Sequence, residues 1–60
     1  MMVVRVQAAL MRLGYFSGDI DGLLGPETRS AITAYQKAQG LPQSGRMDID
    51  TLTKLGISIP

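Results

Sequence analysis

Sixty residues with a net charge of +1, no cysteine and no histidine set narrow limits on what this chain can be. A chain of this length forms one small domain that buries only about 60% of its unfolded surface, which leaves no room for a large catalytic cleft. Without cysteine there is no disulfide or thiolate metal site, and without histidine the commonest general base and zinc ligand are missing. Stability must come from apolar packing.

The charge pattern argues against a nucleic-acid partner, and the apolar pattern argues against a membrane partner. The basic residues are scattered without a run: Arg5, Arg12, Arg29, Lys37, Arg46 and Lys54. This distribution forms no phosphate-binding patch. Arginines also interrupt the apolar stretch 1–14, so it is no secretory signal, and no segment is long enough to span a bilayer. For action outside the cytoplasm, we expect the export signal to lie in a longer parent chain or with another protein.

A first helix is predicted over residues 3–13. Apolar residues recur at three-to-four residue spacing on one face: Val3, Val6, Leu10 and Leu13. Gly14 ends the helix in the left-handed conformation, and Tyr15 folds back on it as an apolar latch. In the loop 16–20 that follows, we expect Ile20 to point inward, with Asp19 and Asp21 pointing outward on either side.

The stretch 21–36 holds a turn, a helix start and an amphipathic helix in succession. Asp21-Gly22 is a turn dipeptide, and Gly25-Pro26 begins a helix predicted over residues 26–39, with Glu27 at the positive end of its dipole. The apolar stripe comprises Leu24, Thr28, Ala31, Ile32 and Tyr35, and the polar stripe comprises Arg29, Ser30, Thr33 and Lys37. Gly40 ends this helix as Gly14 ends the first, and Leu41 takes the latch position.

A third helix is predicted to begin near Asp48, which is a good N-cap, with Leu52 and Leu55 on its buried side. Gly56 ends it. We therefore place the domain at residues 1–56 and predict that residues 57–60 form an extended tail or the start of a linker. A catalytic domain is expected to follow that linker.

The chain contains an internal repeat. Asp21-Gly22 followed by Thr28 is matched by Ser44-Gly45 followed by Thr51, each threonine falling six residues after the turn glycine. The predicted fold is all-α: a small three-helix bundle built from two helix-turn repeats that share the middle helix. The two threonine hydroxyls are expected to hold the preceding loops against the helices.

These residues together resemble the peptidoglycan-binding domain of the three-helix type, over nearly the whole chain. The matching positions are Val6-Gln7, Leu10, Leu13-Gly14-Tyr15, Gly18, Asp21-Gly22, Gly25-Pro26, Thr28, Ala31-Ile32, Tyr35-Gln36, Gly40-Leu41, Gly45 and Thr51-Leu52. The chain departs from the pattern at Leu24 and Tyr35, where the family commonly has phenylalanine.

The resemblance implies a noncatalytic cell-wall anchor, commonly attached to a muramidase, amidase, transglycosylase or peptidase, including phage endolysins. The implied partners are peptidoglycan, through its glycan strand or stem peptide, and a covalently linked catalytic domain. The implied place of action is the cell envelope, periplasm or extracellular space, for a monomer with no cofactor. The propeptides of matrix metalloproteinases share the fold but act through a cysteine switch, and this chain has no cysteine.

The candidate ligand-binding residues form a rim from the loop at residue 16 to the polar stripe: Phe16, Ser17, Asp19, Asp21, Arg29 and Gln36. Phe16 could offer an aromatic face to a sugar ring or simply cover the first helix, and Arg29 could bind stem-peptide carboxylates or be an ordinary solvated charge. Gln7 and Gln36 are favoured as partners of loop backbone groups over ligand contacts. The structural residues are Gly14, Tyr15, Gly22, Gly25, Pro26, Thr28, Ile32, Tyr35, Gly40, Thr51 and Leu52.

The two carboxylates of the first loop, Asp19 and Asp21, have two alternative interpretations: calcium ligands or a catalytic pair. Ser17, Asp19, Asp21 and Gly22 fit positions of an EF-hand loop, but Thr28 stands where the bidentate glutamate is required. No cleft is available to raise the pKa of one carboxyl group. We therefore predict no metal and no catalytic residue.

A cell-wall targeting module is the leading hypothesis for function. The alternatives are a protein-interaction or inhibitory prodomain of the same fold and a helix-turn-helix nucleic-acid binder, whose reading helix would be net acidic.

Overall fold

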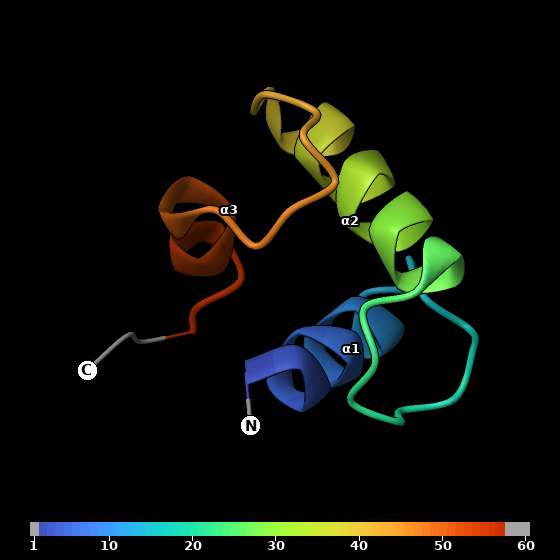
Figure 1. Cartoon of the computed structure of the whole chain (residues 1–60). Helices are drawn as coiled ribbons and strands as arrows, with labels where there is room; N and C mark the ends of the chain where they lie inside the picture. Colours follow the sequence, from blue (N-terminus) through green and yellow to red (C-terminus); the bar gives the residue numbers. More distant parts are fainter. Residues whose placement is uncertain (1, 58–60) are drawn as a thin grey trace.

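The computed structural model describes residues 2–57, and within that range the fold is three α-helices without a strand. The helices are α1 (Met2–Arg12), α2 (Pro26–Gln39) and α3 (Ile49–Lys54). Figure 1 shows α1 lying below α2, with α3 at the side and the long α1–α2 loop passing around one end. The all-helical prediction is confirmed, and the bounds of α2 are those predicted from Gly25-Pro26 and Gly40.

The first helix ends one residue earlier than predicted, which changes the residue that faces the core. Gly14 has φ +89°, and the N–H of Tyr15 donates to the carbonyl of Leu10 at 2.8 Å. This pattern is a Schellman end. The left-handed turn carries Tyr15 back onto the core, whereas Leu13 is 53% exposed. The prediction that Leu13 belongs to the buried face is wrong, because the helix has already ended there.

The other two helices end in the same way. The N–H of Leu41 donates to the carbonyl of Gln36 at 2.8 Å after Gly40, and the N–H of Ile57 donates to that of Leu52 at 2.9 Å after Gly56. Ile57 is half-buried and packs against the core. Ile57 was predicted to belong to the tail at residues 57–60, but it packs on the domain core. Residues 58–60 of that predicted tail lie outside the described residues.

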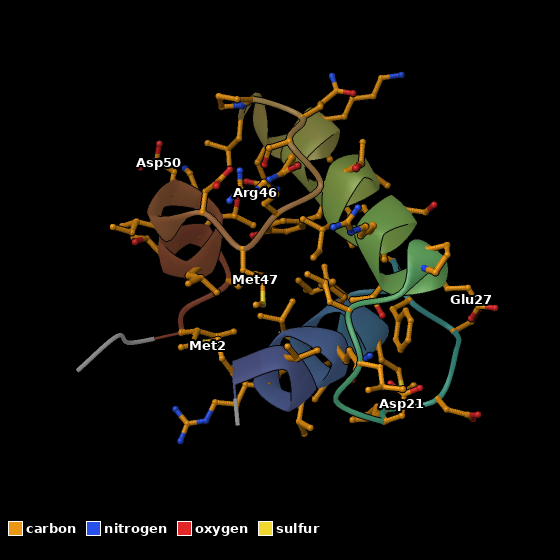
Figure 2. The ribbon with its side chains drawn as sticks, in the orientation of Figure 1. Met2, Asp21, Glu27, Arg46, Met47 and Asp50 are labelled. Carbon is orange, nitrogen blue, oxygen red and sulfur yellow. The ribbon has the colours of Figure 1, made fainter. Side chains whose placement is uncertain are left out.

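The core gathers apolar side chains from all three helices and from the first loop. Its buried members are Val6, Leu10, Phe16, Ala31, Ile32, Tyr35 and Leu52. Tyr15 meets Tyr35 in a T-shaped contact with ring centroids 5.3 Å apart, and Met47 points toward the middle of the bundle in Figure 2. Ile32, Tyr35 and Leu52 are buried in this core, and Tyr15 packs against it.

The first loop buries Phe16 and exposes Ile20, so the prediction that Ile20 points inward is wrong, whereas burial of Phe16 agrees with one of the two interpretations left open for it. Phe16 is 6% exposed, whereas Ile20 is 42% exposed. The N–H of Phe16 donates to the carbonyl of Leu10 at 3.3 Å, so Phe16 is still tied to α1. The loop then passes over the ring at Gly18, where an added Cβ would lie 3.0 Å from the Phe16 Cζ atom. Ile20 lies beyond that crossing and remains at the surface.

Candidate functional site

The long first loop is held to α1 by one buried glutamine, Gln7, which is 0% exposed. Its Oε1 accepts the N–H of Gly22 at 3.0 Å. Its Nε2 donates to Asp21 Oδ1 at 3.1 Å, to the Leu23 carbonyl at 3.1 Å and to Thr28 Oγ1 at 3.0 Å. We call Gln7 with these four partners the first clamp. It fixes the turn immediately before α2.

A second clamp repeats this arrangement one unit later. Gln36 is also 0% exposed, and its Oε1 accepts the N–H of Gly45 at 3.0 Å. Its Nε2 donates to Ser44 Oγ at 3.1 Å, to the Arg46 carbonyl at 3.1 Å and to Thr51 Oγ1 at 2.9 Å. Both glutamines serve loop backbone groups, as predicted. Neither side chain is free to contact a ligand, and the placement of Gln36 on an accessible rim is therefore corrected.

The two threonines also take structural positions in the clamps. Thr28 is 3% exposed and its hydroxyl donates to the Leu23 carbonyl at 3.3 Å, which confirms the predicted bond to the preceding loop. Thr51 is 1% exposed and receives the amide of Gln36. The Thr51 hydroxyl accepts a hydrogen bond from Gln36 Nε2, and Gln36 in turn bonds the loop, so Thr51 is linked to the loop through Gln36.

The hydrogen bonds of the first clamp keep Asp21 ionised. The N–H of Leu23 donates to its Oδ1 at 2.9 Å, and Gln7 donates to the same oxygen. These bonds lower the pKa of Asp21 from its ordinary 3.8. A general acid needs the opposite shift, so Asp21 is suited to accept hydrogen bonds and not to donate a proton.

Two shallow grooves lie side by side along the rim formed by the first loop and the start of α2. The first, of about 410 Å³, is lined by Asp19, Asp21 and Glu27 together with apolar and small residues. The second, of about 560 Å³, is lined by Ser17 and again by Glu27, beside Tyr15 and Phe16. Figure 2 shows Asp21 and Glu27 on this same side of the molecule. The rim is therefore acidic and rich in hydrogen-bond acceptors.

A third groove, of about 430 Å³, lies between α1 and the end of α3. Arg5 and Arg12 line it, with Ala8 and Ala9 of α1 and Leu55, Gly56 and Ile57 after α3. Its charge is opposite to that of the rim. In the sequence both arginines are simply two of the six scattered basic residues. Their seven-residue spacing on one helix face was the available signal, but the contribution of α3 required the fold.

The structure brings together part of the predicted ligand-binding set. Ser17, Asp19 and Asp21 are exposed and line the rim grooves. Phe16 lines the second groove but is only 6% exposed, which favours the interpretation that it covers the first helix over that of an open aromatic face. Arg29 is exposed but lies apart from them, on the side of α2 that approaches Gly45.

Residues 2–57 offer neither a metal site nor a membrane span. No group of three or more His, Cys, Asp or Glu side chains in that range could hold a metal ion. None of the described helices is both long enough and apolar enough to cross a membrane.

The sequence matches the family described as "Putative peptidoglycan binding domain" over residues 2–55. It is 47% identical over 51 residues to "Localization factor PodJL" of Caulobacter vibrioides, covering 85% of this chain and 5% of that protein. It is 43% identical over 49 residues to "Putative OxPP cycle protein OpcA" of Nostoc punctiforme, covering 82% of this chain and 10% of that protein.

A third relative carries the name of a wall enzyme. The chain is 38% identical over 53 residues to "N-acetylmuramoyl-L-alanine amidase CwlM" of Mycobacterium tuberculosis, covering 88% of this chain and 13% of that protein. The chain thus spans between 5% and 13% of the length of these relatives. No solved structure matches it at a significant level.

Proposed function

The chain belongs to the peptidoglycan-binding domain family, and on that premise we propose that it is a noncatalytic module that holds an attached wall-lytic enzyme on its substrate. Such a module acts by raising the local concentration of the enzyme at the wall. The place of action would be the cell envelope, and the module would work as a monomer joined to its catalytic domain.

The main support for this proposal is that the family match extends over residues 2–55, a range that includes both clamps and the whole rim. The clamps use buried glutamines to hold the backbone of the two loops. Ser17 and Asp19 are exposed in the loop whose end the first clamp holds to α1. Preorganised polar groups of this kind suit the hydroxyl and amide groups of a wall polymer, because little entropy is lost when they bind.

The electrostatics of the rim support a binding role over a catalytic one. Asp21 has a lowered pKa because Leu23 and Gln7 donate to it. Hydrolysis of a glycosidic bond by two carboxyl groups requires one with a raised pKa to act as the acid. We therefore assign Ser17, Asp19 and Asp21 to ligand contact through hydrogen bonds.

Binding to purified peptidoglycan sacculi tests the first half of the proposal. The chain should sediment with sacculi in a saturable way, whereas an unrelated domain of the same size and charge should stay in the supernatant. Equal sedimentation of the two would refute wall binding.

Targeting is tested on the parent enzyme with and without this module. Removal should lower the rate of sacculus digestion at low enzyme concentration while leaving hydrolysis of a soluble muropeptide unchanged, because only the anchored substrate benefits from local concentration. Equal losses on both substrates would instead indicate a folding defect in the shortened enzyme.

The second candidate is a protein-interaction or inhibitory module of the same fold. The similarity to a relative named a localization factor is the observation that favours this candidate. The same deletion separates the candidates: a rise in activity on the soluble substrate would favour inhibition, and unchanged activity on both substrates would favour a partner protein.

A further inference from the structure

The aromatic residues of this chain leave little for a sugar ring to stack on. The sequence has one phenylalanine, two tyrosines and no tryptophan. Phe16 is 6% exposed and Tyr35 is 4% exposed, while Tyr15 is half-buried against the core in its T-shaped contact with Tyr35. Proteins usually bind the apolar side of a sugar through an open aromatic face. With no open aromatic face for a sugar ring, the exposed polar and charged side chains are better suited to the peptide part of a wall polymer than to its sugars.

The groove between α1 and the end of α3 has the charge that such a peptide needs. Arg5 and Arg12 are both exposed and line it, and none of the described residues that line it is acidic. The rim groove, in contrast, carries Asp19, Asp21 and Glu27. A ligand with free carboxylates would be repelled at the rim and attracted to the arginine groove.

The dimensions of this basic groove suit a short extended peptide. Residues seven apart on a helix lie on nearly the same face and about 10.5 Å apart along the axis. Three extended residues span about 10 Å, so one short peptide can present carboxylates to both arginines. The methyl groups of Ala8 and Ala9 and the side chain of Ile57 provide a small apolar floor between them.

From this charge and spacing, we propose that the basic groove lined by Arg5, Arg12 and Ile57 binds the carboxylate-bearing stem peptide of the wall polymer. The inference rests on the proposed wall-binding function and names the part of the polymer recognised. The planar guanidinium groups pair with carboxylates through parallel hydrogen bonds. The small apolar floor accommodates alanine-sized side chains.

The test compares two double variants of the chain that carry the same net charge. Arg5→Gln/Arg12→Gln alters the basic groove, and Lys37→Gln/Arg46→Gln removes two exposed basic side chains that do not line it. Each double variant changes the net charge from +1 to −1. Affinity for intact sacculi should fall by at least about tenfold in the first variant, because each lost charge-assisted pair weakens binding. The second variant should bind nearly as well as the original chain.

A single-site pair tests the groove without removing an arginine. Ala8→Glu places a carboxylate between Arg5 and Arg12, while Ala34→Glu places one on an exposed position of α2. Circular dichroism should show both variants folded, since glutamate is a good helix former. Only Ala8→Glu should weaken sacculus binding.

Removing the ligand group completes the test. Sacculi stripped of stem peptides by an amidase should bind the original chain and Arg5→Gln/Arg12→Gln equally. A difference that persists on stripped glycan, or equal losses in the two double variants on intact sacculi, would overturn the basic-groove assignment while leaving wall binding in place. Failure of the original chain to bind intact sacculi would refute the proposed function itself, and this inference with it.

Chemical-shift mapping gives an independent readout. Titration with a muropeptide that carries free carboxylates should move the amide signals of Ala8, Arg12 and Ile57, and amidation of those carboxylates should abolish the shifts. Shifts confined to the rim would overturn the proposal.

Discussion

The second clamp predicts a large and specific loss of stability when Gln36 is replaced by leucine. The substitution preserves the approximate volume but removes the acceptor of the Gly45 N–H and the donor to the Arg46 carbonyl. Leaving a buried backbone group without a partner costs about 1–3 kcal/mol, so two such groups cost about 2–6 kcal/mol. The added apolar burial of leucine returns about 1.5–3 kcal/mol. With both ranges taken at their midpoints, about 4 and about 2 kcal/mol, a net loss of roughly 2 kcal/mol is expected.

That loss is large for this domain and should exceed the loss at the first clamp. A chain of sixty residues has a free energy of unfolding of roughly 3–9 kcal/mol. Gly45 is buried, whereas Gly22 is half-buried and Leu23 is exposed, so water can replace Gln7 more easily than Gln36. Urea unfolding followed by far-ultraviolet circular dichroism should give a larger loss for Gln36→Leu than for the matched Gln7→Leu.

A second substitution at the same position separates hydrogen bonding from packing. Gln36→Glu keeps an acceptor for Gly45 but, when ionised, offers no donor to the Arg46 carbonyl, so the folded-state pKa of this glutamate should rise above its usual value of about 4.3. A raised folded-state pKa stabilises the folded form at low pH, and the variant should regain stability as pH falls through that value. Equal costs at Gln36 and Gln7, together with a pH-independent Gln36→Glu, would refute the reasoning.

Three further predictions concern the Asp21 carboxylate, the turn glycines and the buried Phe16 ring. Because the pKa of Asp21 is lowered from 3.8, its ionised form stabilises the fold at higher pH, and that contribution is lost as pH falls through the lowered value. The variant Asp21→Asn should therefore lose less stability at acid pH than the original chain. Urea unfolding between about pH 2 and pH 5 measures this difference. Gly45→Ala should lower the melting temperature more than Gly56→Ala does. Both glycines have positive φ, so each substitution costs about 1–2 kcal/mol in backbone strain. Only at Gly45 would the new Cβ also lie 3.1 Å from Thr33 Oγ1. Phe16→Ala should cost about 3–5 kcal/mol because the ring is buried, whereas Phe16→Leu should stay folded and still bind sacculi.

Each of these results has a contrary outcome. An equal loss of stability at acid pH in Asp21→Asn and in the original chain would mean that the clamp does not bias the carboxyl group. Equal melting temperatures for the two glycine variants would place the whole cost in the backbone conformation. A folded Phe16→Leu that has lost wall binding would return Phe16 to the ligand-binding set.

The helices were predictable because their ends are encoded locally. Gly25-Pro26 and Gly40 determine both ends of α2, and the structure has the same bounds. The repeated spacing from turn glycine to threonine also identified the two units that the clamps join. A buried amide at Gln7 or Gln36 was foreseeable because each flanks apolar positions on its helix.

The first loop was less predictable, because no periodicity tells which apolar side chain turns inward. Phe16 and Ile20 are separated by four residues, and the choice between them depends on the Schellman end before the loop and on the crossing of Gly18 over the ring. The basic groove was not foreseen for a different reason. Arg5 and Arg12 share a helix face, but Ile57 joins them only through the packing of α3, which local sequence does not specify.

The clamps also bear on how quickly the domain can form. Their side-chain hydrogen bonds connect residues between 8 and 21 positions apart, and each clamp joins a helix to the turn that directly follows it in the chain. These separations are about 0.13–0.35 of the chain length, above the relative contact order of about 0.07–0.12 of fast-folding helical bundles, so the clamps are expected to close after the helices have formed. The first clamp is complete once Thr28 is present, so α1, its loop and the start of α2 can be assembled before α3 is available. A module of this kind can reach its folded state as it is synthesised, without waiting for the rest of a longer parent protein.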